Sequence, residues 1–255
     1  MPTRLVVAGA AGRMGREIVA AAAGDPAVEV VAGTVRPGSG RAVEGLKVFE
    51  SPLEALRAAD VLVDFTTSAA TIANARAAAE LGKAAVIGTT GLSEAQVDEL
   101  RGLGARAPIL YGRNMSVGVN TVLRVLPALV RALEGYDVEI TEAHHRHKRD
   151  APSGTALAIA EAVAATLGRP LGELAVYGRE GIRPRQPGEI GIHALRGGGN
   201  AGEHTVLFAD EGEQIQLVHR AYSRRTFALG ALRAARWVAG QPPGFYGMPD
   251  VLGAS

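Results

Sequence analysis

The sequence contains no cysteine, which excludes disulfides, thiolate metal sites and cysteine catalysis. No apolar run approaches the roughly 20 residues that a membrane span needs. We expect no signal peptide, because the short apolar stretch at the start leads directly into glycines. The net charge is only +1, so nothing draws the whole molecule to nucleic acid or anionic lipid. We therefore expect a cytoplasmic protein without a nucleic-acid or membrane partner.

The first part of the chain alternates short apolar segments with helical patterns. The 255 residues are 47% hydrophobic and 21% charged, an ordinary globular composition, and they suffice for one large domain or two small ones. Residues 4–9 and 28–35 have strand patterns, with a helix pattern between them. The same alternation continues to about residue 115. It predicts an α/β domain over residues 1–115, with a Rossmann-like, doubly wound parallel sheet.

The pattern changes in the second part of the chain. A long helix carrying Pro127 precedes a strand that ends near His145, and another helix begins near Ser153. Three strand patterns then follow one another. We predict a second, α+β domain over residues 116–223, built on a mixed or open sheet. The glycine- and proline-rich residues 168–189 are interpreted as a loop between elements.

Glycines follow the first predicted strand at the spacing of a dinucleotide-binding turn. Gly9 permits a tight turn, Gly12 lets the backbone approach a pyrophosphate, and Gly15 lets the helix pack closely on the strand. The strand before them and the helix after them are the context that supports this interpretation. Arg13 lies within reach of a phosphate. The alternative is a strand-to-helix turn without a ligand, with Arg13 as a surface charge.

Ligands in such folds lie beyond the carboxyl ends of the strands. Three further strand ends could therefore line the cofactor crevice, although each by itself could be only a turn. They are Phe65 with Thr66, residues 88–91, and residues 112–116.

A second candidate site lies in "TEAHHRHKRDAPSGTA", residues 141–156. Because side chains alternate along a strand, the strand end sends His144 and His145 to opposite faces. Lys148 follows, and Ser153, Gly154 and Thr155 begin a helix whose free N–H groups and dipole attract an anion. Histidine is the usual general acid near neutral pH. The stretch therefore favours a carboxylate-binding site with an adjacent proton donor.

Other interpretations of this stretch remain open. It could be a charged loop that only caps the helix. Metal binding lacks support from carboxylate–histidine spacing on a helix, so we predict no metal. A nucleic-acid loop would carry interleaved aromatic residues, and this one has none.

The chain strongly resembles the dihydrodipicolinate reductase (4-hydroxy-tetrahydrodipicolinate reductase) family of bacterial lysine and diaminopimelate biosynthesis. The motifs "VAGAAGRMGR", "DFT", "IGTTG", "NMSVGVN", "EAHHRHKRDAPSGTA", "GEHTVLFAD" and "SRRTFALGA" follow one another in the family's order. They cover nearly the whole chain, and "HHRHKRDAPSGTA" is the most specific of them. The resemblance implies NAD(P)H-dependent reduction of a cyclic imine dicarboxylate, with hydride transfer to a ring carbon followed by protonation.

The resemblance also implies residue roles and an assembly. His144 and Lys148 are expected to be catalytic, and His145, Ser153, Gly154 and Thr155 to bind substrate. A homotetramer is implied, as is a C-terminal helix, within about residues 224–255, that returns to the first domain. The expected cofactor-binding residues are Gly9, Ala10, Ala11, Gly12, Arg13, Met14, Gly15, Arg36, Phe65, Gly88, Thr89, Thr90, Gly112, Arg113, Asn114, Met115 and Arg224.

Two positions depart from the family's pattern. Val35 stands where many members carry an acidic residue after the second strand, and Arg113 stands where the residue is often small or apolar. Because Val35 cannot repel a 2′-phosphate and Arg36 follows it, we predict NADPH as the preferred cofactor, with NADH possible. The rival functions are another Rossmann dehydrogenase and a non-enzymatic dinucleotide sensor, which would need the glycines but neither His144 nor Lys148.

Overall fold

The computed structural model describes residues 1–253 and divides into two compact units. The first unit comprises Met1–Val117 together with the chain from Arg224 onward, and the second comprises Gly118–Ser223. Within residues 1–253, no helix is both long and apolar enough to cross a bilayer.

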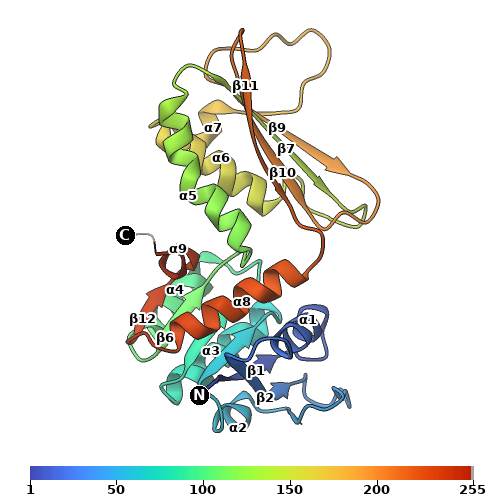
Figure 1. Ribbon diagram of the computed structural model, residues 1–255, viewed down its shortest axis with the longest axis vertical. Helices are drawn as coiled ribbons and strands as arrows, with labels where there is room; N and C mark the ends of the chain where they lie inside the picture. Colours follow the sequence, from blue (N-terminus) through green and yellow to red (C-terminus); the bar gives the residue numbers. More distant parts are fainter. Residues whose placement is uncertain (254–255) are drawn as a thin grey trace. The chain divides into compact units, whose positions relative to one another are not determined.

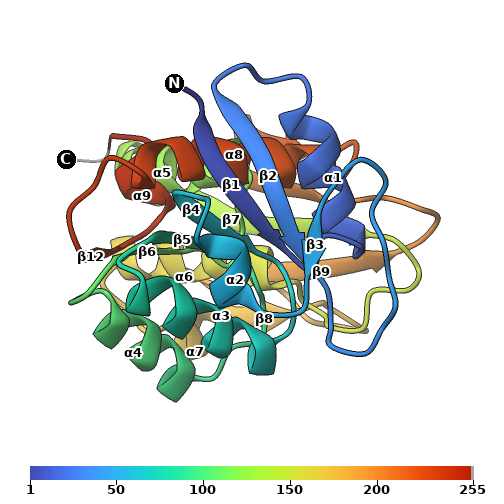
Figure 2. The same cartoon turned by 90° about the horizontal axis from the view of Figure 1, so that it is seen from below.

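The first unit is a seven-stranded sheet in the order β12-β6-β5-β4-β1-β2-β3, and each neighbouring pair is parallel. Helices cover both faces, so the predicted Rossmann-like fold is confirmed (Figure 2). Its strands are β1 (Thr3–Ala8), β2 (Val28–Thr34), β3 (Val48–Phe49), β4 (Val61–Asp64), β5 (Ala84–Ile87), β6 (Pro108–Tyr111) and β12 (Gly244–Tyr246). Its helices are α1 (Arg13–Ala22), α2 (Pro52–Leu56), α3 (Ser68–Glu80), α4 (Glu94–Leu103), α8 (Arg225–Val238) and α9 (Met248–Val251).

The central strands are apolar on both faces because each face carries its own core. Along β1, Leu5 and Val7 pack with α1, α8 and α9, whereas Val6 and Ala8 pack with α2, α3 and α4. Strands buried on both sides read as continuous apolar runs rather than as alternating ones. That explains why the short apolar segments of the sequence were recognisable as strands of a parallel sheet.

The second unit is a five-stranded mixed sheet in the order β11-β10-β7-β9-β8. The β7–β9 and β9–β8 pairs are parallel, and β10 is antiparallel to both of its neighbours, so the predicted mixed sheet is confirmed. Figure 1 shows helices α5 and α6 on one face of this sheet. The elements are α5 (Val117–Ala132), β7 (Asp137–His144), α6 (Gly154–Thr166), α7 (Leu171–Leu174), β8 (Ala175–Tyr177), β9 (Ile190–Arg196), β10 (Glu203–Ala209) and β11 (Gln214–Arg220).

Two segments differ from the sequence interpretation. Residues 168–189 are not only a loop, because α7 and the edge strand β8 lie within them. The C-terminal region is not one helix, because β12 and α9 follow α8 and β12 pairs with β6. Both added strands are three residues long, which is too short for a period-two pattern to show. Only pairing with a neighbouring strand identifies them.

Candidate active site

The glycine turn after β1 has the geometry that a pyrophosphate loop requires. Gly9 has a φ of +66°, in the left-handed region that favours glycine. The N–H of Gly12 donates to the carbonyl oxygen of Gly9 at 2.8 Å. A Cβ on Gly15 would stand 2.3 Å from that same oxygen, so α1 can approach the turn only with glycine at this position. The turn therefore presents backbone and a helix N-terminus to a ligand, which suits a dinucleotide phosphate.

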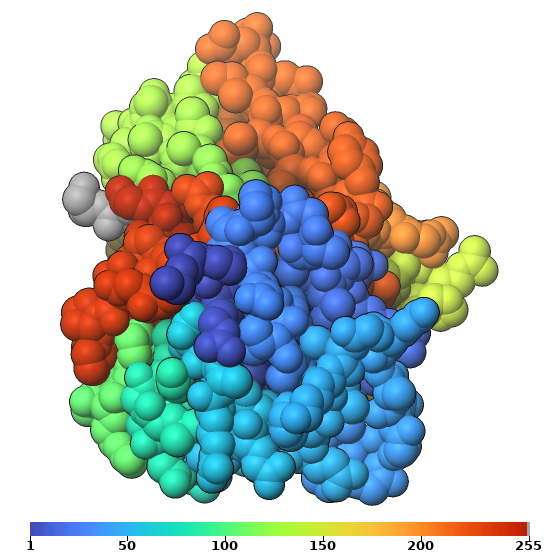
Figure 3. Space-filling view, turned by 60° about the horizontal axis from the view of Figure 1, so that its bottom comes forward, coloured from blue at the N-terminus to red at the C-terminus, as the bar shows by residue number. Residues whose placement is uncertain are grey.

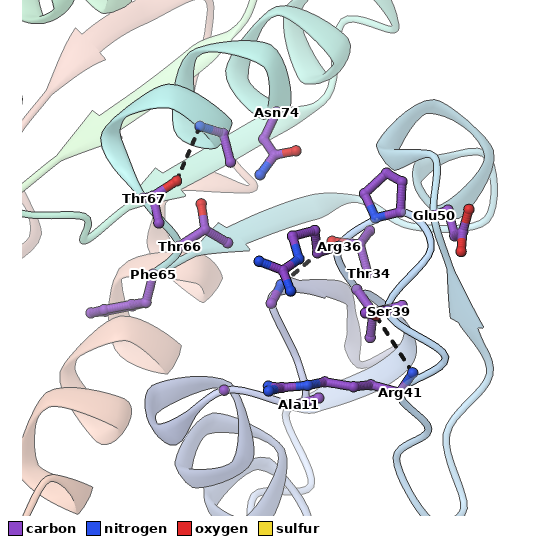
Figure 4. Close-up of a pocket in the computed structure, with 15 residues that line it drawn as sticks. Ala11, Thr34, Arg36, Ser39, Arg41, Glu50, Phe65, Thr66, Thr67 and Asn74 are labelled. Atoms are coloured by element: carbon purple, nitrogen blue, oxygen red, sulfur yellow. Dashed lines mark hydrogen bonds between the residues drawn. The ribbon is translucent and has the colours of Figure 1, made fainter.

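A pocket of about 420 Å³ opens beside this turn (Figure 4). Ligand pockets typically have volumes of about 300–1,000 Å³. The strand ends of β1, β2 and β4 contribute to its lining, as expected for an open parallel sheet. Its lining residues are Gly9, Ala11, Gly12, Thr34, Val35, Arg36, Pro37, Ser39, Arg41, Glu50, Phe65, Thr66, Thr67, Ala70 and Asn74.

A buried carboxylate organises the polar side of this pocket. Asp64, the last residue of β4, is fully buried. Its Oδ1 accepts hydrogen bonds from the N–H and hydroxyl of Thr66 at 2.7 Å each, and from Thr71 and Thr89 at 3.3 and 3.2 Å. Its Oδ2 accepts one from the amide of Asn74 at 2.8 Å. Asp64 thus joins the end of β4, the start of α3 and the segment after β5.

The far end of the pocket carries charges of both signs. The side chains of Arg36 and Arg41 extend toward the space between Ala11 and Thr66 (Figure 4). Glu50 also lines the pocket, and its Oε1 accepts a hydrogen bond from the N–H of Gly38 at 2.9 Å. The loop that bears these arginines lies on the surface of the first unit, in the light blue of Figure 3.

The structure distributes the predicted cofactor residues unevenly. Gly9, Ala11, Gly12, Arg36 and Phe65 line the pocket directly. The others do not line it, although all lie in the first unit: Ala10, Gly15, Gly88, Thr89 and Met115 are buried, Met14, Gly112 and Asn114 are half-buried, and Arg13, Thr90, Arg113 and Arg224 are exposed. Gly88 packs under the ring of Phe65, where an added Cβ would lie 2.3 Å from ring atoms.

The predicted catalytic and substrate-binding residues all lie in the second unit, at the end of β7, in the turn after it and at the start of α6. His144 is the last residue of β7 and is 9% exposed. Lys148 is half-buried, and its Nζ lies 2.9 Å from Oδ2 of Asp150. The Nδ1 atom of His145 is buried and has no hydrogen-bond partner within residues 1–253.

Ser153, Gly154 and Thr155, which we call the carboxylate cradle, differ in their roles at the start of α6: the first caps the helix, and the other two begin it. The hydroxyl of Ser153 caps the helix by accepting from the N–H of Ala156 at 3.1 Å, and Ser153 is buried. Gly154 is exposed and Thr155 is half-buried, and they are the first residues of the helix. N–H groups in a first helical turn precede the intrahelical hydrogen-bond ladder, so this end attracts an anion.

The chemistry of His144 depends on a residue that sequence reasoning missed. Glu142 lies two positions earlier on the same face of β7 and is fully buried. Its Oε2 lies 2.6 Å from Nδ1 of His144. The guanidinium of Arg196 donates to both carboxylate oxygens at 2.7 Å each, and the N–H of Ser153 donates to Oε1 at 3.0 Å. One carboxylate therefore holds the histidine and the start of α6 together.

These contacts set the charge states in the site. Burial alone raises the pKa of Glu142, but hydrogen bonds from Arg196, His144 and Ser153 outweigh it and lower the pKa below its usual value. For His144, burial is the largest effect and lowers the pKa; Glu142 opposes it, and the charges of Lys148 and Arg196 add to it. In the ligand-free protein we therefore expect ionised Glu142 beside a largely neutral His144 at pH 7.

A second histidine supports the same region. His204 of β10 lies with its Nε2 3.0 Å from the hydroxyl of Ser153, and its ring meets that of His144 edge-on at 5.2 Å between centroids. Burial is the main reason that its pKa falls to about 4. His204 is thus a neutral packing and hydrogen-bonding partner near pH 7.

The missed residues left only weak signals in the sequence. Glu142 could have been found by period-two counting back from His144, since both share one strand face. Arg196 and His204 come from strands far along the chain and meet Glu142 only through the sheet pairing. Asp64 was visible only as part of "DFT", and no sequence pattern singled out Glu50. Within residues 1–253, no group of three or more metal-ligating side chains is placed to hold a metal ion.

A Rossmann unit with a glycine turn, joined to an α+β unit with a histidine-centred polar site, is the arrangement of a two-domain, dinucleotide-dependent reductase or dehydrogenase. Two family models match the chain: "Dihydrodipicolinate reductase, N-terminus" over residues 3–115 and "Dihydrodipicolinate reductase, C-terminus" over residues 118–252. The chain therefore belongs to the dihydrodipicolinate reductase family, whose members use a nicotinamide dinucleotide. The family predicted from the motifs is confirmed.

Individual relatives agree with this membership. The chain is 53% identical to a 4-hydroxy-tetrahydrodipicolinate reductase of Rubrobacter xylanophilus, with 99% of each chain covered. It is 50% identical to the enzyme of that name from Chromohalobacter salexigens, with 98% of each covered. Among solved structures, it resembles dipicolinate-bound dihydrodipicolinate reductase from Paenisporosarcina sp. TG-14, with a TM-score of 0.79, 26% identity, and coverage of 98% of this chain and 99% of that one.

Proposed function

We propose that this chain is a 4-hydroxy-tetrahydrodipicolinate reductase in which His144 and Lys148 protonate a substrate held at the start of α6. One observation carries the assignment of roles: the buried carboxylate of Glu142 bonds both His144 and the N–H of Ser153. A proton donor and an anion-attracting helix start are thereby held side by side.

The enzyme catalyses the NAD(P)H-dependent reduction of 4-hydroxy-tetrahydrodipicolinate to tetrahydrodipicolinate, in lysine and diaminopimelate biosynthesis. When bound, the reduced nicotinamide would supply a hydride to a ring carbon of the substrate, and the 4-hydroxyl group leaves the ring as water, so that the overall reaction consumes one hydride and one proton. The glycine turn suits the pyrophosphate because Cβ atoms on Gly12 and Gly15 would meet the carbonyl oxygen of Gly9, so only glycines allow the tight turn that brings the start of α1 to the phosphates. Arg36, Phe65 and Thr66 would line the dinucleotide beyond the turn.

The second unit would supply binding and the proton. Gly154 and Thr155, with Lys148, would hold a substrate carboxylate, while Ser153 keeps the helix start in place as its cap. His145, with its unpartnered Nδ1, would contact the substrate. A bound dicarboxylate adds negative charge beside His144, which favours the imidazolium form. His144 would then deliver its proton from Nε2 to the carbanion or enamine that follows hydride addition.

A coupled assay tests the activity directly. The upstream synthase generates the substrate in place, and oxidation of NADPH is followed by absorbance. We expect steady oxidation only when the synthase and its own substrates are present. A dinucleotide sensor would bind NADPH without turnover, and a reductase of another specificity would ignore this substrate.

The carboxylate cradle predicts an inhibitor. Pyridine-2,6-dicarboxylate should compete with substrate, because its two carboxylates match a site built from Lys148 and the start of α6; dipicolinate is also the ligand named for the Paenisporosarcina reductase. Thr155→Val removes a hydroxyl but keeps the shape, so the inhibition constant should rise. Steady-state inhibition of both proteins measures this. Equal inhibition of the two would place the carboxylate elsewhere.

The charged side chains that line the pocket beside the glycine turn, where the adenosine part of the cofactor would lie, predict a cofactor preference. Two exposed arginines, Arg36 and Arg41, line the pocket, and the one acid there, Glu50, is engaged by the N–H of Gly38. A 2′-phosphate should therefore be favoured, giving NADPH a higher kcat/KM than NADH, with a gap that shrinks at high salt. Arg36→Ala should reduce use of NADPH more than of NADH, and Glu50→Gln should widen the gap. A clear preference of the native enzyme for NADH at low salt would refute this.

The assembly and location are also proposed. In the part of the chain that the structure describes, residues 1–253, helices cover one face of the five-stranded sheet, and the other face carries Leu195, Leu207 and Val218, with Leu195 55% exposed. This face would be covered in a homotetramer, which light scattering after gel filtration would detect. A cytoplasmic location fits a biosynthetic reductase of this family and can be checked by cell fractionation.

A further inference from the structure

The carboxylate of Glu142 is saturated with donors. It receives both arms of Arg196, the N–H of Ser153 and a ring nitrogen of His144, all within 3.0 Å. It is also fully buried, so its oxygens are shielded from bulk solvent. Charge-assisted, bidentate pairs of this kind hold both partners in one geometry. Glu142 can therefore neither rotate nor lose its charge without breaking several bonds.

This contact decides which nitrogen of His144 carries hydrogen. An ionised carboxylate only accepts hydrogen bonds. The 2.6 Å contact therefore requires an N–H at Nδ1, whether the ring is neutral or charged. The other nitrogen, Nε2, lies against Gly202, where an added Cβ would approach it to 3.0 Å. Nε2 is thus the atom left to exchange a proton, and a side chain at position 202 would crowd it.

We propose that Glu142, held by Arg196, is a positioning residue that fixes the tautomer and ring orientation of His144 so that Nε2 transfers the catalytic proton. The catalytic part rests on the proposed function, whereas the tautomer can be tested without any substrate. Fixing the tautomer of a catalytic histidine is the established use of a buried carboxylate in hydrolase triads. Here the carboxylate also anchors the first turn of α6 through Ser153.

Several charged or titratable groups face His144 from the elements packed against it. They are Glu142 on β7, Arg196 on β9, His204 on β10, with His219 of β11 behind it, and Lys148 in the following turn. Glu142 is the one anion among them. Removing its charge leaves only groups that disfavour the imidazolium form, so the pKa of His144 should fall further.

The first experiment measures the tautomer itself. The native protein is labelled with ¹⁵N-histidine, and ring nitrogen shifts are recorded against pH, with His144→Gln used to assign the resonances. We expect neutral His144 to carry its hydrogen on Nδ1. In Glu142→Gln, which keeps the shape but removes the charge, this population should fall and the pKa of His144 should drop. A native His144 with its hydrogen on Nε2 overturns the proposal, whatever the enzyme's substrate is.

The second experiment measures catalysis as a function of pH. Loss of the tautomer-fixing carboxylate costs about 10⁴-fold in hydrolase triads, so kcat of Glu142→Gln should fall roughly 10²-fold or more with little change in KM. A general acid works only while protonated, so the alkaline limb of kcat should move to lower pH. Glu142→Asp keeps the charge. It should therefore recover part of the lost rate and move the alkaline limb of the kcat–pH profile back toward its native position. A uniform fall in rate with an unmoved limb would show a merely structural role and overturn the proposal.

The chain offers a matched control on the same strand. Glu139 lies on the opposite face of β7, where it contacts Nε2 of His193 at 2.6 Å and Nη1 of Arg179 at 2.8 Å. Glu139→Gln removes a similar charge from a similar cluster. It should leave both the His144 tautomer and the pH limb unchanged. If the native tautomer is as expected but no substrate-dependent oxidation of NADPH occurs, the reductase assignment fails while the positioning of His144 stands.

Discussion

Replacing His144 with alanine is expected to lower kcat roughly 10²–10⁴-fold, because a positioned general acid typically contributes that much to the rate. Cofactor affinity should stay close to that of the native enzyme, since His144 lies in the second unit and the glycine turn in the first. Single-turnover kinetics and fluorescence titration with NADPH separate the two quantities. Lys148→Ala should have an effect of the same kind.

His147→Ala is the matched control for this prediction. His147 belongs to the same turn but is exposed, and its ring lies 6.2 Å from that of His145. Its replacement should change kcat little. Near-normal turnover in His144→Ala would remove this residue from the mechanism. A large loss in both variants would point instead to a general disturbance of the turn.

Replacing Gly15 with alanine is expected to disrupt both folding stability and cofactor binding. Its Cβ would stand 2.3 Å from the carbonyl oxygen of Gly9 and 2.7 Å from the Cα of Ala10. These are backbone atoms, so the clash cannot be relieved by turning a side chain. Overpacking typically costs about 1–3 kcal/mol, and we expect the upper end of that range. Because the displaced turn is the phosphate loop, the Kd for NADPH should rise at least about 10-fold, which corresponds to about 1.4 kcal/mol.

Gly102→Ala provides the comparison for thermal unfolding and NADPH titration. Gly102 lies inside α4 of the same unit, and nothing stands within 4 Å of its added Cβ. Because Gly102 lies in the last turn of α4, alanine there should stabilise the protein by no more than the roughly 0.5–1 kcal/mol expected in the middle of a helix. A Gly15→Ala variant with a native Tm and native NADPH affinity would contradict the tight-turn interpretation.

Local signals predicted most of the helix starts and the order of the elements. Ser51 accepts from the N–H of Glu54 at the start of α2, and Ser93 forms the predicted capping box with Gln96. Both devices act between residues three positions apart, so a window of four residues describes each of them. The edge strands β8 and β12 escaped because pairing partners distant in sequence stabilise them.

The sequence by itself determined the two-part α/β and α+β architecture, the glycine turn, the family, and the strand end and following turn that carry His144 and Lys148. Each of these depends on local periodicity, short-range spacing or a contiguous motif. Only the tertiary structure decided the partners of His144, because Glu142, Arg196, Ser153 and His204 come from three different strands and the start of a helix. It likewise decided that Asp64 joins three segments and that Glu50 enters the pocket of Arg36. The physical reason is that burial and hydrogen bonding between distant segments arise only when strands pair and helices pack, and no local pattern encodes which side chains then meet.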